Sequence, residues 1–240
     1  RTKEIYERIE KNSELDDESI KIAAFASFIS HKEKKVTANK FCNNPIDFIY
    51  SSNLSTYLKN LDLFIADAIE ELNDIKTSWE PDNKATKKGF QSTSNLFKNP
   101  IGRLKDLKAI IISELASYYL RFKDEECSYI KKWPSKKNLV GWHVILKQQG
   151  YQNPHIHPGG WLSGVIYLKV VPHLGKNEGA IELGLNGELY LDLNSPKVIF
   201  QPKVGDIIMF PSSLHHKTIP FSVDEDRISI AFDLIPNVKY

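Results

Sequence analysis

The sequence has few cysteines, no long hydrophobic run and almost no net charge, and each of these shortages excludes a class of protein. Its two cysteines, Cys42 and Cys127, form neither a disulfide framework nor a Cys-x-x-Cys metal site, so we expect a reducing, cytoplasmic environment. No apolar run approaches the roughly 20 residues of a membrane-spanning helix. The 32 basic and 30 acidic side chains give a formal net charge of +2, which argues against nucleic acid or a membrane surface as the main partner.

The length and the first residues of the chain also limit the interpretation. At 240 residues it has room for one large domain, alone or with a helical appendage. No secretory signal pattern opens it. It begins with Arg1 and its single methionine is Met209, so we expect it to be part of a longer polypeptide.

The first half of the chain has the apolar periodicity of helices. Ser19–Ser30, Leu54–Ile75 and Ile101–Phe122 each repeat apolar residues at helical spacing. The stretch Lys76–Asn99, between the last two, is polar and rich in Lys, Ser, Thr and Asn. It predicts a long loop, which could act as a lid over a binding site.

The composition changes near residue 138. Ten of the twelve glycines and six of the seven histidines lie between Leu139 and Tyr240. Six short runs there have the two-residue periodicity of strands, and Gly, Pro, Asn or Asp separates most of them: Val140–Gln148, Trp161–Val170, Gly179–Leu185, Val198–Gln201, Asp206–Phe210 and Arg227–Leu234. Many short strands without intervening helices predict an antiparallel sandwich or barrel.

Two segments of this second half carry paired histidines. "NPHIHPGG" contains His155 and His157, whose side chains would point to the same face of a strand. "FPSSLHHKTIPF" contains His215 and His216, of which only one can face the same way as the first pair. Imidazole suits iron, zinc, copper or nickel. The spacing alone leaves two interpretations open: a metal site, or hydrogen-bonded histidines on a strand that ends in a turn.

Several motifs in a fixed order resemble the iron- and 2-oxoglutarate-dependent oxygenase superfamily, and more narrowly the oxygenases at the C-terminus of bacterial tetratricopeptide-repeat proteins. They cover roughly residues 89–240 and read "GFQSTSNLF", "GWHVILKQQGYQNPHIHPGGWLSGVIYLKVVP", "GAIELG", "PKVGDIIMFPSSLHHKTIPF" and "DRISIAFDLIP". The resemblance implies an α+β fold: a double-stranded β-helix, the jelly-roll barrel also found in cupins, preceded and buttressed by α-helices. We expect its core at about residues 139–240, within an oxygenase domain of residues 51–240. Residues 1–50 would form a helical N-terminal segment, which could be the tail of a helical repeat region.

The resemblance also implies a metal site. Fe(II) would be bound by His155, His157 and His216. The superfamily pattern has a carboxylate ligand where His157 stands, so the set of ligands departs from that pattern here. Asp233 and Glu182 are conceivable carboxylate donors, although nothing in their spacing favours them.

The co-substrate implied by the resemblance is 2-oxoglutarate. Arg227 and Ser229 of the "RIS" motif would hold it, because a planar guanidinium can form two bonds to a carboxylate. Tyr167 would point into the barrel and either hydrogen-bond the co-substrate or pack in the core. With O2 as the oxidant, the enzyme would hydroxylate a protein or peptide side chain, or a small molecule, and convert 2-oxoglutarate to succinate.

Two other classes of function fit the same residues. A cupin-like domain would bind a metal through the three histidines without turning over 2-oxoglutarate. A structural jelly roll would use the histidines to stabilise the fold without metal. Arg227 separates the oxygenase from the cupin, since it has a clear role only if a dicarboxylate binds nearby.

Overall fold

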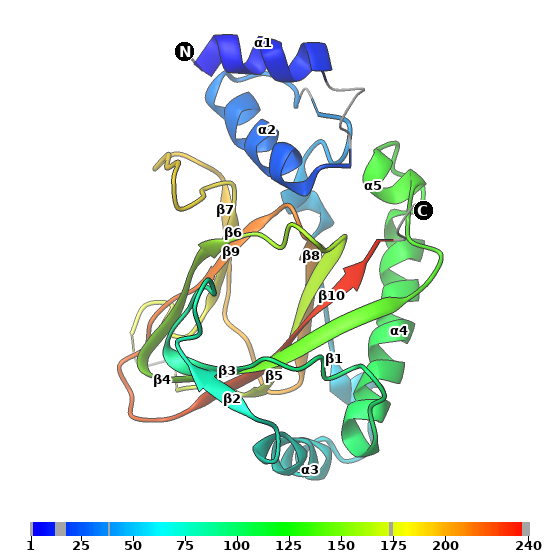
Figure 1. The fold of residues 1–240 in the computed structure, drawn as a ribbon, viewed down its shortest axis with the longest axis vertical. Coiled ribbons are helices and arrows are strands. Elements are labelled where there is room, and N and C mark those ends of the chain that lie inside the picture. The colour runs from blue at the N-terminus through cyan, green and yellow to red at the C-terminus, as the bar shows by residue number, and fades with distance from the viewer. Residues whose placement is uncertain (1, 13–17, 38, 173–174, 237–240) are drawn as a thin grey trace.

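The protein is a curled antiparallel β-sheet with helices packed around it (Figure 1). The computed structural model describes residues 2–12, 18–37, 39–172 and 175–236. The helices are α1 (Thr2–Asn12), α2 (Ile20–Lys32), α3 (Leu61–Asn73), α4 (Gly102–Phe122) and α5 (Ser128–Lys131), with 3-10 turns at Pro45–Phe48 and Leu54–Thr56. The strands are β1 (Tyr50–Asn53), β2 (Thr77–Trp79), β3 (Thr86–Ser92), β4 (Asn138–His155), β5 (Leu162–Lys169), β6 (Ile181–Gly184), β7 (Lys197–Phe200), β8 (Asp206–Pro211), β9 (His215–Thr218) and β10 (Arg227–Ile235). None of the helices in these ranges is long and apolar enough to cross a membrane.

The long strand β4 curls the sheet. The strand order is β1-β8-β5-β10-β4-β9-β6-β7, and β3 pairs with both β4 and β2. β4 has 18 residues, of which Asn138–Leu146 pair with β10, while Gln152 and His155 pair with β9. It therefore joins a first wall, containing β8, β5 and β10, to a second wall, containing β9, β6 and β7. This is the arrangement expected for a double-stranded β-helix.

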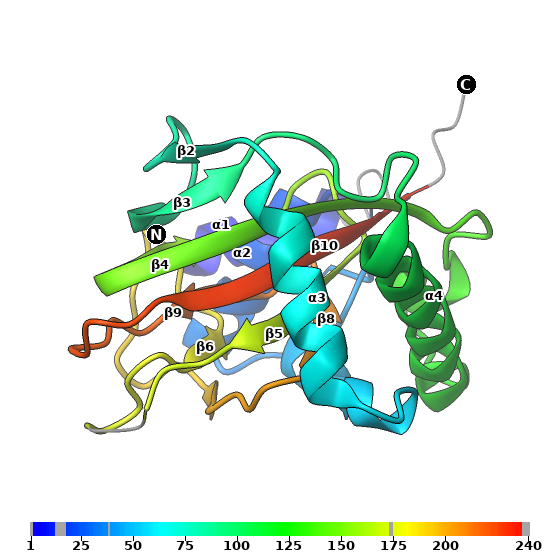
Figure 2. The same ribbon diagram turned by 90° about the horizontal axis from the view of Figure 1, so that it is seen from below.

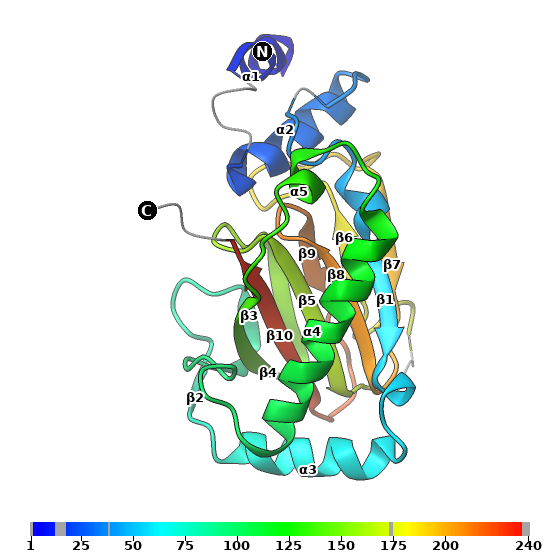
Figure 3. The same cartoon turned by 90° about the vertical axis from the view of Figure 1, so that its right-hand side faces the viewer.

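The strands of the first wall have one face toward the helices and one toward the barrel interior. Alternate residues of β10 pack in the large hydrophobic core with α3 and α4: Ile228, Ile230, Phe232 and Leu234. The residues between them face the interior: Arg227, Ser229, Ala231 and Asp233. Figures 2 and 3 show α3 and α4 lying against the outside of this wall. The helices thus stabilise the wall from behind and leave its inner face available for a site.

The predicted helix Leu54–Ile75 is wrong at its start, because α3 begins only at Leu61. Asn60 caps the helix there, its side-chain oxygen accepting a hydrogen bond from the backbone N–H of Leu63 at 3.1 Å. The preceding Leu54–Thr56 form a 3-10 turn instead.

The predicted loop Lys76–Asn99 is also wrong, because it contains the hairpin of β2 and β3. β3 pairs with β4 from Thr86 opposite Gln152 to Gln91 opposite Val144, so the segment is a strand of the barrel. Its residues are mostly Thr, Lys, Gln and Ser, and this polarity hides the strand pattern in the sequence. Pairing with β4 supplies the order that local propensity does not.

Helix α2 packs on the second wall and on the loop between β6 and β7, and α1 packs on α2 (Figure 1). Phe28 of α2 lies against Tyr190, with 4.7 Å between the ring centroids. The Tyr6 hydroxyl of α1 donates to the backbone oxygen of Val36 at 3.0 Å. Residues 1–50 are thus largely helical where they are described, and their separation from residues 51–240 as a domain stays a prediction.

His143 on β4 gives the fold a measurable pH dependence. Its side chain is 1% exposed, and its Nδ1 has no hydrogen-bond partner among the described residues. Burial lowers the pKa of His143 from 6.5 to about 4. The unfolded chain therefore takes up a proton near pH 6.5 that the folded protein takes up only near pH 4. The contribution of His143 to stability is present above pH 6.5 and is lost as the pH falls toward 4, by on the order of 3 kcal/mol.

We expect His143→Gln to weaken this pH dependence, since glutamine does not titrate. Urea unfolding of the metal-free protein between about pH 7 and about pH 4.5 measures it. The change of unfolding free energy with pH that remains in the variant comes from the other buried histidines. If the free energy of unfolding of His143→Gln depended on pH as strongly as that of the wild type, the assignment of this pH dependence to His143 would be wrong.

Candidate active site

Three histidines meet where β4 and β9 lie side by side. His155 ends β4, and its cross-strand partner on β9 is His216. Their ring centroids are 4.2 Å apart. His157 follows in the next turn, with its ring centroid 5.1 Å from that of His155 and 4.9 Å from that of His216. One nitrogen from each ring lies within 4.8 Å of the other two, so the three side chains could hold a metal ion.

The turn after β4 holds His157 in place. The backbone N–H of His157 donates to the oxygen of Ser212 at 3.1 Å, and its own oxygen accepts from the N–H of Gly160 at 2.9 Å. A Cβ at Gly160 would lie only 2.5 Å from the Ser212 hydroxyl oxygen. The second glycine of "HPGG" therefore allows the close packing that brings His157 beside the other two rings.

All three rings use Nδ1 in a hydrogen bond. The acceptors are two backbone oxygens and one carboxylate: Asn153 O at 2.7 Å from His155, Leu214 O at 3.2 Å from His216, and Asp233 Oδ1 at 2.7 Å from His157. Because carbonyl and carboxylate oxygens only accept, each Nδ1 carries the hydrogen and each Nε2 keeps its lone pair. This pattern is typical of histidines that bind a metal through Nε2.

Burial also keeps the rings of His155 and His216 neutral. It lowers the pKa of His155 to about 4, with a smaller contribution from the neighbouring His157. It lowers the pKa of His216 well below 6.5, again with smaller contributions from the other two rings. Neutral imidazole is the form that binds a metal, so these two histidines do not have to lose a proton at neutral pH.

The adjacent His215 faces away from the site. Its Nε2 lies 3.1 Å from the hydroxyl of Tyr190, and the two ring centroids are 5.3 Å apart. Consecutive residues of a strand point to opposite faces. β9 therefore presents His216, and not His215, to the other two histidines.

Neither of the two candidate carboxylates belongs to the three-histidine group. Glu182 on β6 forms ion pairs with Lys197 and Lys217, each at 3.2 Å. Asp233 on β10 contacts the group through the Nδ1 of His157, on the ring edge opposite Nε2. The potential metal ligands are therefore three imidazoles. The Asp233 carboxylate would not bind the metal itself but is hydrogen-bonded to one of these imidazoles, that of His157.

A narrow cavity leads from the three histidines into the barrel, and Arg227 lies in its wall. Arg227 is 2% exposed, its Nε donates to the oxygen of Gly179 at 3.0 Å, and its guanidinium lies 4.9 Å above the ring of Tyr167. Burial lowers the pKa of Arg227. Within the part of the chain that the structure describes, no acidic side chain forms an ion pair with it. A buried cation without a counter-ion is costly, so this end of the cavity favours an anion.

Two hydroxyl groups lie near the same end of the cavity. Tyr167 and Ser229 are cross-strand partners on β5 and β10, and both line the cavity. The Tyr167 hydroxyl is buried and has no hydrogen bond of normal geometry to a described residue, and burial raises its pKa to about 12. Together with Arg227, these hydroxyl groups make this end of the cavity polar, which again points to a polar ligand.

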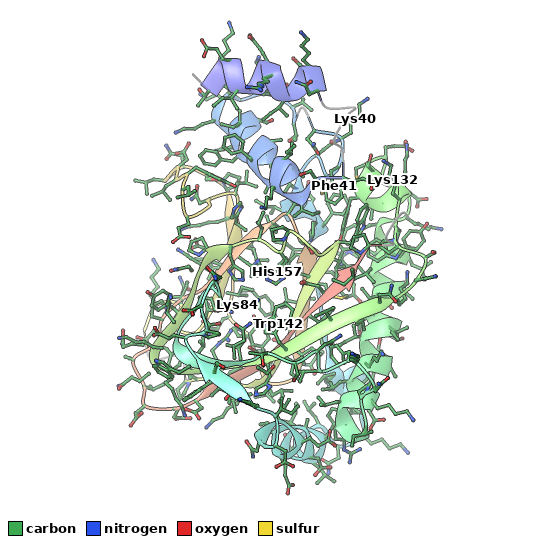
Figure 4. The ribbon with its side chains drawn as sticks, viewed as in Figure 1. Lys40, Phe41, Lys84, Lys132, Trp142 and His157 are labelled. Atoms are coloured by element: carbon green, nitrogen blue, oxygen red, sulfur yellow. The ribbon has the colours of Figure 1, made fainter. Side chains whose placement is uncertain are left out.

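A larger cleft of about 570 Å³ opens above His155 and His157. Amide and hydroxyl side chains around β3 make much of its lining: Asn83, Gln91, Ser92, Thr93, Ser94 and Asn95. Trp142 borders it, with its ring centroid 5.3 Å from that of His157, and Figure 4 shows Lys84 and Trp142 beside His157 in the middle of the barrel. The segment predicted as a loop thus forms one wall of the cleft.

The chain resembles known oxygenases both in sequence, by a match to a family, and in fold. Residues 141–233 match the family described as "Putative 2OG-Fe(II) oxygenase". No curated protein matches the chain significantly. Among solved structures, a prolyl-4-hydroxylase of Pseudomonas putida is 11% identical with a TM-score of 0.55, over 79% of this chain and 93% of that chain.

Two further structures have the same fold. HygX of Streptomyces hygroscopicus, solved with nickel and 2-oxoglutarate, is 11% identical with a TM-score of 0.52, over 79% of this chain and 83% of that chain. A prolyl hydroxylase in complex with a hypoxia inducible factor oxygen degradation domain peptide fragment, from Trichoplax adhaerens, is 11% identical with a TM-score of 0.54. That match covers 95% of this chain and 92% of that chain.

These likenesses confirm the predicted fold, an α+β protein built on a double-stranded β-helix. The matched family segment runs from β4 to β10 and contains His155, His157, His216 and Arg227. The sequence match to the oxygenase family is limited to this segment, and the likeness to the solved structures is one of fold.

Proposed function

We propose that the protein is an Fe(II)- and 2-oxoglutarate-dependent oxygenase that hydroxylates a side chain of a protein or peptide. One observation carries the proposal: three imidazoles and a buried arginine that has no acidic partner among the described residues line the same narrow cavity. A dicarboxylate that chelates a metal needs a metal-binding group at one end and an anion-binding group at the other. This cavity has both.

The donor atoms fit an iron ion. His155, His157 and His216 would hold it through Nε2, because each Nδ1 is already used and the imidazoles are suitable ligands for iron. Three protein ligands leave coordination positions for the co-substrate and O2.

The other end of the cavity fits 2-oxoglutarate. Arg227 would bind the carboxylate that does not contact the metal, since its planar guanidinium can form two parallel bonds. The hydroxyl groups of Ser229 and Tyr167 lie in the same wall and could donate to that carboxylate. Binding of this anion would supply the counter-ion that Arg227 lacks.

When bound, Fe(II) and 2-oxoglutarate supply the oxidising chemistry, in which O2 is reduced, 2-oxoglutarate loses CO2 to become succinate, and one oxygen atom enters a C–H bond of the substrate. The chain's own residues hold and shield the reactants. The ring of Phe210, 4.7 Å from that of His216, and the side chain of Val165 give the cavity an apolar wall that limits water. Trp142 borders the cleft at His157 and would orient the substrate there.

The cleft supports a protein or peptide substrate. Its amide and hydroxyl lining can bond to backbone groups, and the similar prolyl hydroxylase from Trichoplax adhaerens binds a peptide fragment. A small molecule is the second candidate, because a cleft of about 570 Å³ lies within the usual range of small-ligand sites.

We also propose membership in the subgroup fused to tetratricopeptide repeats, and a cytoplasmic location. The helices α1 and α2 before the barrel support the first proposal. The scarcity of cysteine, with Cys42 and Cys127 alone, supports the second, because disulfide frameworks are rare in the cytoplasm.

Adding Fe(II) anaerobically should give a weak visible charge-transfer band only when 2-oxoglutarate is present, because the band arises from the chelated complex. A titration of the purified protein with Fe(II), with and without 2-oxoglutarate, measures this. Iron binding without a band would favour the cupin-like domain, and no iron binding would favour the structural jelly roll.

A further inference from the structure

Asp233 lies directly behind His157. Its Oδ1 is 2.7 Å from the Nδ1 of His157, which in turn has its Nε2 free for a metal. Asp233 is 8% exposed, so water satisfies little of its charge. The superfamily pattern places a carboxylate at residue 157, and this chain instead has an imidazole there with a carboxylate hydrogen-bonded to it.

The surroundings of Asp233 hold its carboxylate in one position. The β10–β5 register puts Asp233 opposite Ser163, whose hydroxyl lies 2.7 Å from Asp233 Oδ1. The Ser163 hydroxyl is also 2.8 Å from the hydroxyl of Ser212, on the segment that binds the backbone of His157. A Cβ at Gly160 would approach the Asp233 carboxyl carbon to 3.1 Å, so the glycine leaves room for it. The Ser163 hydroxyl, itself hydrogen-bonded to Ser212, thus holds this carboxylate by a hydrogen bond, and a glycine leaves the space that it occupies.

A buried carboxylate is costly to keep, because its charge loses most of its solvation by water. Asp233 does not pair with a lysine or arginine in any described ion pair, and its partner is an imidazole that is itself placed to bind a metal. Its energetic role is therefore difficult to explain by fold stability alone.

We propose that Asp233 is a positioning residue that fixes the Nδ1–H tautomer and the orientation of His157, and that it supplies from one hydrogen bond away the negative charge that a direct carboxylate ligand would give. This inference rests on the proposed function, because it assumes that His157 binds the metal. A carboxylate bonded to Nδ1–H increases electron density at Nε2 and strengthens its bond to a metal. Partners of this kind change metal affinity by roughly 10- to 100-fold.

The first test is Co(II) affinity, measured by the visible spectrum of the protein titrated with Co(II) alone. Asp233→Ala should weaken binding by roughly 10- to 100-fold, and Asp233→Asn by less, since an amide oxygen can still accept from Nδ1–H but carries no charge. Asp224→Asn is the matched control, because it removes an exposed carboxylate from the loop before the same strand. Equal affinities for the wild type, Asp233→Asn and Asp233→Ala would overturn the proposal.

The second test reads the tautomer in metal-free protein. In ¹⁵N-histidine NMR spectra, His157 should be the Nδ1–H form in the wild type and in Asp233→Asn. In Asp233→Ala it should shift toward a mixture with the Nε2–H form, because the carboxylate acceptor is gone and the Ser163 hydroxyl that remains, 3.0 Å from Nδ1, can either donate or accept. A fixed Nδ1–H tautomer in Asp233→Ala would show that Asp233 does not set it.

A double-mutant cycle with His157→Asp separates positioning from a loss of structure. His157→Asp restores the direct carboxylate of the superfamily pattern and removes the imidazole that Asp233 orients. In this background Asp233→Asn should leave Co(II) affinity unchanged or make it tighter, because it removes repulsion between two carboxylates. The same loss of affinity in both backgrounds would mean that Asp233 acts only through the fold.

The outcomes also distinguish this inference from the proposed function. If the wild-type protein does not bind Co(II), the metal site itself is absent and both fail. If the wild type binds Co(II) and the Asp233 variants bind it equally well, only the role of Asp233 fails. Circular dichroism of each variant checks that it is folded before the titration.

Discussion

His216→Ala should abolish metal binding, with an affinity more than about 100-fold below that of the wild type, while His215→Ala should retain it. The loss is expected because His216 supplies one of three imidazole nitrogens that lie within 4.8 Å of one another. The expected effect exceeds that of a residue which only supports a ligand, because the bond to the metal itself is removed. Titration with Fe(II) or Co(II) measures it, and conversion of 2-oxoglutarate to succinate should disappear together with the metal.

The two adjacent histidines are matched controls for each other. His215 and His216 are 6% and 7% exposed, so both substitutions remove the same atoms from equally buried positions of β9. Damage to the strand should affect both variants, whereas loss of a ligand should affect only His216→Ala. Equal metal affinity in the two variants, whether high or low, would contradict the assignment of His216.

Arg227→Met should weaken 2-oxoglutarate binding by about 30-fold or more while leaving metal affinity nearly unchanged. Truncating one partner of a buried charge pair costs about 2–5 kcal/mol, and tenfold in affinity corresponds to about 1.4 kcal/mol. The metal should still bind, since Arg227 contacts none of the three histidines through a hydrogen bond. The charge-transfer band of the Fe(II) complex, followed at increasing 2-oxoglutarate, measures the affinity.

The same variant has a second effect, of opposite sign, without ligand. Arg227 is a buried cation with no acidic partner in the described chain, so an apolar side chain of similar length should leave the ligand-free protein at least as stable, with a gain on the order of 1 kcal/mol. Stabilisation by added 2-oxoglutarate should then be lost. Arg121→Met, at an exposed position of α4, is the matched control. A ligand-free Arg227→Met that is strongly destabilised, yet binds 2-oxoglutarate normally, would assign Arg227 to the fold.

The fold could be predicted where burial follows a simple period. The run Trp161–Val170 became β5 almost residue for residue, because its alternate positions pack against the helices and face the barrel. β3 was missed because both its faces carry polar side chains, and only its pairing with β4 makes Thr86–Ser92 a strand. Pairing partners distant in the sequence are not visible in a local pattern.

The site shows the same limit. The spacing of His155 and His157 predicted a shared face, but the register that sets His155 directly opposite His216 depends on how β4 bends, which no local signal gives. Asp233 was named from the sequence as a conceivable carboxylate donor, and its place six residues after Arg227 on one predicted strand puts both residues on the same face. The contact of Asp233 with His157 could not be predicted from the sequence, since this contact depends on the turn at "HPGG".

β10 sets the distance between the two ends of the candidate site. Arg227 and Asp233 stand at two ends of its inner face, six residues or about 20 Å of extended chain apart, while Ile230 and Phe232 anchor its outer face to the helices. The number of residues in the strand thus fixes the spacing of Arg227 and Asp233, and packing of its outer face against the helices holds the strand in place. Adding or removing one residue between these two ends would turn one of them toward the helices and put an apolar side chain in its place. Relatives that take larger or smaller substrates are therefore expected to vary the rim of the cleft and to keep the number of residues in this strand.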